Sequence, residues 1–66
     1  MNCTELRARV INLRRQIAQI EDQIENLKNE PKTLEIIEEI DNLENEVIGI
    51  KQDVIRLNKQ YKQKNC

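Results

Sequence analysis

Aliphatic side chains recur along the chain in two ladders, at spacings that alternate between four and three residues. The first ladder comprises Leu6, Val10, Leu13, Ile17, Ile20, Ile24 and Leu27, and the second comprises Ile36, Ile40, Leu43, Val47, Ile50, Val54, Leu57 and Tyr61. An average period of about 3.5 residues is typical of the seam along which the helices of a coiled coil pack. We therefore predict an all-α fold, an antiparallel two-helix hairpin of the coiled-coil type, as a single domain of residues 1–66.

Pro31 separates the two ladders. Proline lacks a backbone N–H and disfavours helical geometry in the residue before it, so one helix must end near this point. The pattern predicts a first helix at about 4–28 with Thr4 as its N-cap, a tight turn at about 29–31, and a second helix at about 31–62. Pro31 itself suits a first helical turn, where its missing donor costs nothing.

Two cysteines, Cys3 and Cys66, lie near the two ends of the sequence. With a tight turn, Leu13 lies near Val47, so Cys66 extends past Cys3 by about 9 residues, on the order of 13 Å of helix. A disulfide needs Cα atoms within about 7 Å, which only a longer turn or frayed ends would allow. We therefore expect free thiols, the usual state in a reducing cytosol.

Missing residue types exclude the common catalytic and metal sites. The chain has no His, Ser, Trp or Phe, so neither a Ser-His-Asp triad nor imidazole metal ligation is possible within it. Its single glycine, Gly49, cannot form a phosphate-binding loop, and it is either a tolerated surface residue or a point of close backbone approach. We expect no metal site and no cofactor, and the residues alone identify no catalytic group.

The polarity of the chain gives expectations about its location and partners. No apolar run approaches membrane-spanning length, and the first residues do not resemble a signal peptide, so we expect a cytoplasmic protein with no membrane partner. The net charge is −1. No aromatic or glycine-rich elements accompany the basic residues, so we do not expect nucleic acid binding.

Apolar residues also occur beside the two ladders, on positions that widen one side of the predicted hairpin. These residues are Ile11, Ala18, Leu34, Ile37, Ile48 and Ile55. A contiguous apolar patch in water usually marks an interaction site. We expect self-association, as a homodimer that forms a four-helix bundle, and the alternative is a different partner protein.

The charges are separated along the hairpin. Residues 17–46 contain ten acidic side chains and two lysines, whereas the remaining residues contain nine basic and two acidic ones. Helix dipoles do not explain this, because they disfavour the arginines at the start of the first helix. Either an antiparallel dimer or a charged partner would complement the two ends.

Residues 31–41 read Pro-Lys-Thr-Leu-Glu-Ile-Ile-Glu-Glu-Ile-Asp, and residues 13–17 read Leu-Arg-Arg-Gln-Ile. These segments resemble the small stage-zero sporulation regulatory phosphatases, which are helical hairpins with a proline near the turn followed by Ser-Gln-Glu-Leu-Asp. The similarity covers roughly residues 10–47. It implies removal of the phosphoryl group from the aspartyl phosphate of a response regulator.

The informative matches to that family are Pro31, Glu39 and Asp41. Ile37 replaces the family's serine and Glu38 replaces its glutamine. A glutamine can orient water toward phosphorus without adding charge, whereas Glu38 brings a negative charge toward the phosphoryl group.

We predict that a partner binds the turn-proximal part of the second helix, where apolar side chains stand beside charged ones. The predicted partner-binding residues are Leu34, Ile37, Glu38, Asp41, Glu44 and Ile48. The expected function is a small, regulatory, self-associating protein–protein interaction module rather than an enzyme. The alternative is a response-regulator aspartyl-phosphate phosphatase that controls sporulation.

Overall fold

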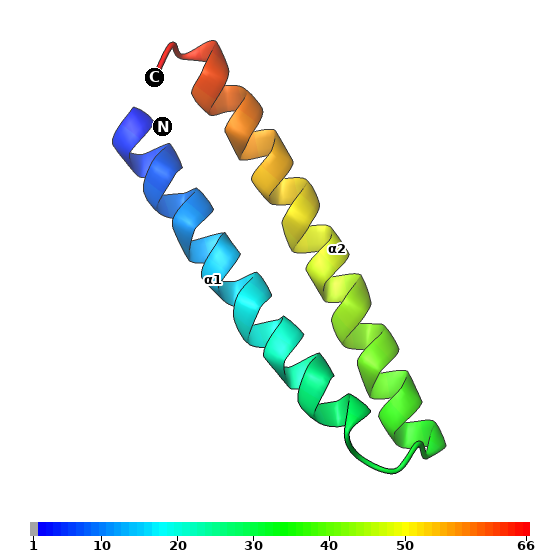
Figure 1. The fold of residues 1–66 in the computed structure, drawn as a ribbon. Helices are drawn as coiled ribbons and strands as arrows, with labels where there is room; N and C mark the ends of the chain where they lie inside the picture. The colour runs from blue at the N-terminus through cyan, green and yellow to red at the C-terminus, as the bar shows by residue number, and fades with distance from the viewer. Residues whose placement is uncertain (1) are drawn as a thin grey trace.

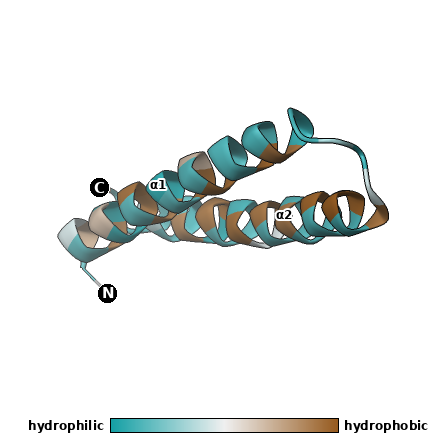
Figure 2. Ribbon diagram, turned by 90° about the horizontal axis from the view of Figure 1, so that it is seen from below, coloured by the Kyte–Doolittle hydropathy of each residue, from teal (hydrophilic) through white to brown (hydrophobic). Residues whose placement is uncertain are grey.

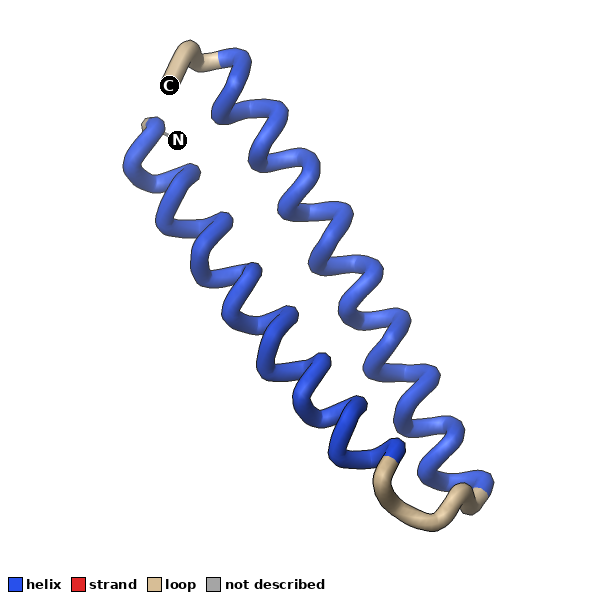
Figure 3. Tube along the Cα trace, in the orientation of Figure 1, coloured by secondary structure: helices blue, strands red, loops and turns tan. Residues whose placement is uncertain are grey.

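The chain folds into two antiparallel α-helices that lie side by side along their length (Figures 1 and 3). The computed structural model describes residues 2–66, with α1 at Cys3–Lys28 and α2 at Leu34–Gln63. Residues 29–33 connect the helices, and residues 2–66 contain no strand. The all-α antiparallel hairpin predicted from the two ladders is confirmed, and it measures 48 × 14 × 12 Å.

Helix α1 begins at Cys3, one residue earlier than predicted, because Asn2 rather than Thr4 caps it. The Asn2 Oδ1 atom accepts a hydrogen bond from the Glu5 N–H at 2.8 Å. Asparagine is a somewhat better N-cap than threonine, since its side chain satisfies an amide hydrogen that the helix itself leaves unpaired. Thr4 consequently lies within the first turn of the helix.

Helix α2 begins later than predicted, at Leu34, and Pro31 lies in the connecting loop. Thr33 caps the helix, because its Oγ1 atom accepts a hydrogen bond from the Ile36 N–H at 3.3 Å. The Thr33 N–H donates to the Pro31 carbonyl at 2.9 Å, which holds the loop just before the cap. A threonine that can satisfy a free amide hydrogen starts the helix more effectively than the proline before it.

Both predicted ladders form the contact between α1 and α2. Every ladder residue is buried or half-buried, and the most buried side chains are Leu6, Val10, Ile24, Val47 and Val54. Figure 2 shows hydrophobic positions recurring along both helices between hydrophilic ones. The predicted apolar seam is therefore confirmed, although it is narrow enough that many of its members stay partly exposed.

The register between the helices differs from the predicted one. Leu13 lines the same groove as Leu57, ten positions further along α2 than the expected neighbour Val47. Val47 instead lies beside Ile24. The ladders do not decide between these registers, because a helix pair can slide from one ladder position to another and still bury both ladders.

The loop decides the register. Glu30 lines a groove together with Glu39. The loop therefore continues past the end of α1, alongside the first turns of α2, before it reaches Leu34. The expected tight turn is therefore wrong, because the loop extends to Thr33 and needs room beside α2. As a result, the first turns of α2 project past the end of α1.

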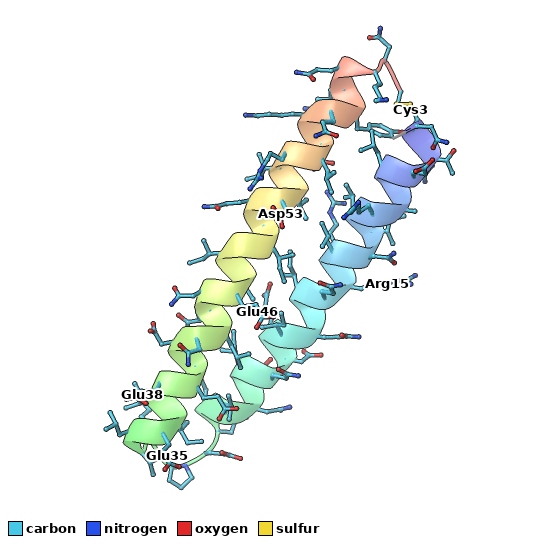
Figure 4. All side chains as sticks on the ribbon, turned by 180° about the vertical axis from the view of Figure 1, so that it is seen from behind. Cys3, Arg15, Glu35, Glu38, Glu46 and Asp53 are labelled. Carbon is cyan, nitrogen blue, oxygen red and sulfur yellow. A yellow bond between two sulfur atoms is a disulfide. The ribbon has the colours of Figure 1, made fainter. Side chains whose placement is uncertain are left out.

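A disulfide between Cys3 and Cys66 closes the opposite end of the hairpin, so the expectation of free thiols is wrong. The shifted register removes the mismatch that a tight turn would create, and the two Cα atoms lie 6.0 Å apart. Leu6, one turn into α1 from Cys3, is fully buried. Figure 4 shows Cys3 beside the end of α2.

We expect removal of this disulfide, by Cys3→Ser together with Cys66→Ser, to lower the free energy of unfolding by about 4 kcal/mol. The reason is that a cross-link closing a loop of roughly 60 residues restricts the unfolded chain by that amount. Urea unfolding at one fixed protein concentration measures the change. The reduced parent should behave like the double variant, and equal midpoints for the oxidised parent and the variant would contradict the prediction.

We expect Gly49→Ala to stabilise the hairpin by about 1 kcal/mol, because alanine loses less backbone freedom in a helix interior than glycine does. A Cβ atom at Gly49 would meet no other atom within 4 Å. Thermal unfolding followed by circular dichroism measures the effect. A lower melting temperature would show instead that another backbone approaches this position in the assembled protein.

Candidate protein-interaction surface

The two long sides of the hairpin differ in polarity. Among residues 2–66, five large apolar side chains are exposed, by between 42% and 71%, and they are Ile11, Leu34, Ile37, Ile48 and Ile55. Residues spaced by seven share a helix face, so Leu34 and Ile55 lie on the same face of α2 as Ile48. We call the side of the hairpin that carries these five residues the apolar side.

Two grooves between the helices identify this side on both α1 and α2. Ile48 lines one groove with Ile24 and Val47, and Ile11 lines the other with Val10 and Tyr61. The α1 residues at the groove edges, Arg7, Arg14, Glu21 and Lys28, follow one another at intervals of seven. Both grooves therefore open on the same side of the hairpin.

The groove beside Ile48 has oppositely charged residues on its two edges. Glu21, Glu25 and Lys28 contribute from α1, and Glu44 and Lys51 contribute from α2. The groove, which has a volume of about 490 Å³, is therefore lined by three acids and two bases. Its floor is the buried seam, and charged side chains of both signs stand beside the exposed Ile48.

The opposite side of the hairpin is polar outside the seam. The two grooves on this side expose seam leucines only, and their other lining residues are Arg9, Gln23, Asn26, Glu30, Glu39, Asp53, Arg56 and Gln60. Here Arg56 pairs with Asp53 at 3.2 Å between Nη2 and Oδ1, within α2. This polar side resembles ordinary solvated surface, and the exposed apolar residues lie on the other side.

The six predicted partner-binding residues are all exposed. Heptad spacing places Leu34 and Asp41 on the same face as Ile48, and Ile37 on the same face as Glu44. Glu38 lies one turn after Leu34, on the outer rim of the apolar side, where its side chain points away from α1 (Figure 4). The six residues thus form a strip along α2.

Leu34, at the turn-proximal end of that strip, is its most exposed apolar residue, whereas Ile37 is about as exposed as Ile48. Leu34 and Ile37 lie on the part of α2 that projects past α1, and Leu34 is the more exposed of the two. Helix α1 could cover the residues at the start of α2 only if its C-terminal end reached as far along the hairpin as the start of α2. The observed register prevents this. This exposure could not be foreseen from the heptad pattern alone.

The residues that carried the sporulation-phosphatase resemblance are separated in the structure. Pro31 lies in the loop, and Asp41 lies on the apolar side. Glu39 lines a groove on the polar side with Leu43, because two residues along a helix differ by about 200° in direction. The three matches therefore do not converge on one point of the hairpin surface.

Residues 2–66 contain no group of three or more acidic or cysteine side chains placed to hold a metal ion. Neither helix of the described chain combines the length and the apolar character needed to cross a bilayer. Comparison of the chain with protein-family models, curated proteins and solved structures gives no match. A functional assignment must therefore come from the surface itself.

Proposed function

We propose that the protein is a small interaction module that binds other α-helical surfaces through its apolar side, and that it self-associates through this side into a dimer of four helices. The observation that supports this proposal is the contrast between the five exposed apolar residues on one side and the polar residues on the other. A hairpin that is surrounded by water on all sides needs no apolar side, whereas a hairpin that packs one side against another surface does.

Energetics favour covering this side. Fully burying a large aliphatic side chain contributes about 1.5–3 kcal/mol, so the five half-exposed residues together could supply several kcal/mol on association. Within residues 2–66, the hairpin itself buries only five side chains almost completely. Chains near this size often gain the missing stability from a second copy or a covalent cross-link.

We expect Ile48→Glu to weaken self-association by at least about 100-fold, because it places a charge where the interface should be dry. Gln60→Glu is the matched control, since it introduces the same side chain on the polar side of α2 and should change the dissociation constant by less than about twofold. Sedimentation equilibrium at micromolar concentration measures both. A parent chain that sediments only as a 7.9 kDa monomer would contradict self-association.

The resemblance to sporulation phosphatases supports a second candidate, removal of the phosphoryl group from a response-regulator aspartyl phosphate. Incubation with phosphorylated response regulators tests it. The phosphatase candidate predicts faster loss of phosphate, which Asp41→Ala should abolish without loss of helicity. Unchanged phosphate lifetimes over a range of regulators would leave the interaction module as the better proposal.

A further inference from the structure

One stripe of α2 on the apolar side has a distinctive order of residues. At successive intervals of seven it carries Asp41, Ile48, Ile55 and Lys62, all of them exposed. The two isoleucines are 54% and 55% exposed, so the hairpin leaves more than half of each side chain uncovered. An acid stands at one end of the stripe and a base at the other.

The stripe is complementary to itself when reversed. We propose that α2 pairs with α2 of a second copy in antiparallel orientation, about a two-fold axis midway between Ile48 and Ile55. Asp41 of each copy then lies beside Lys62 of the other, and Ile48 of each lies beside Ile55 of the other. This proposal rests on the proposed function, because it specifies how the self-association occurs.

Residues that flank the stripe agree with the same axis. Reversal about this axis places Glu44 opposite Lys59 and Asn45 opposite Asn58 of the second copy. Acid thus meets base, and amide meets amide, at positions that the choice of axis did not use. An isologous interface requires this kind of agreement, because each contact must occur twice.

A parallel arrangement in register has the opposite property. It would place Asp41 beside Asp41, Glu44 beside Glu44, and Lys62 beside Lys62 of the second copy. Like charges that face each other across an interface are unfavourable. They therefore disfavour the parallel arrangement, whereas the antiparallel arrangement contains no such pairs at these positions. The charge order along α2 therefore selects the antiparallel dimer.

The pairing covers α2 from about Asp41 to Lys62 and leaves its projecting start uncovered. Leu34 and Ile37 lie beyond the antiparallel overlap, so dimer formation does not bury Leu34, the most exposed large apolar residue within residues 2–66. The dimer would consequently present two such ends, one at each extreme of the assembly.

Charge reversal in a double-mutant cycle tests the orientation. Asp41→Lys alone and Lys62→Glu alone should each weaken the dimer by about tenfold, since each acts at two symmetry-related pairs, and the combined variant should return to within about threefold of the parent. Asp41 and Lys62 of one chain are 21 positions apart on α2, or about 30 Å, which is far beyond the range of screened coupling. Recovery can therefore arise only between copies.

Glu46→Lys is the matched control, because it makes the same charge change as Asp41→Lys at an exposed position one heptad from Glu39 and Asp53, which line the polar side. It should alter the dimer dissociation constant by less than about twofold. A combined variant as weak as the product of the two single changes would overturn the antiparallel pairing while leaving self-association intact. A monomeric parent would overturn both proposals.

A distance measurement gives an independent result that does not need the charge variants to fold. A spin label on Glu35→Cys, with the native disulfide retained, lies near the turn-proximal end of α2 (Figure 4). The antiparallel pairing predicts about 50 Å between the two labelled positions along the helix direction, from the rise of the helix on either side of the axis. A label separation near 20 Å would show the parallel arrangement and overturn the proposal.

Discussion

The narrow contact between α1 and α2 is the constraint on which the other features of this protein depend. Two helices exclude water from one stripe each, and in the described part of this chain only five side chains become almost fully buried. A seam of that width leaves little stability in reserve. The cross-link between Cys3 and Cys66 offsets the small buried area of the seam, because it restricts the unfolded chain. The exposed isoleucines offer further apolar area to bury outside the seam.

The sequence was sufficient to predict the helices and the residues of the seam, but not how far one helix slides past the other. Alternation of four and three residues defines a face, and every ladder residue from Leu6 to Tyr61 lies on it. The same alternation is satisfied by several registers. The choice came from the loop, where Thr33 rather than Pro31 sets the start of α2, and the disulfide was missed because it depends on that choice.

Prediction of the candidate surface had a similar limit. Heptad positions correctly placed Ile37, Asp41 and Ile48 outside the seam, because side-chain direction follows from spacing alone. The projection of Leu34 beyond α1 required the register. Ile55 and Lys62 lie on the same stripe of α2 as Asp41 and Ile48, at intervals of seven residues beyond the predicted strip.

The disulfide also makes the hairpin a closed covalent ring, with the peptide connection at one end and the sulfur bridge at the other. Exposed irregular segments are where proteases cut most readily, and residues 29–33 are the segment of this kind between the helices. One cut there would leave two peptide chains, one for each helix, that remain joined by the sulfur bridge. Separation of α1 from α2 requires a second covalent event, either reduction of the bridge or another cut.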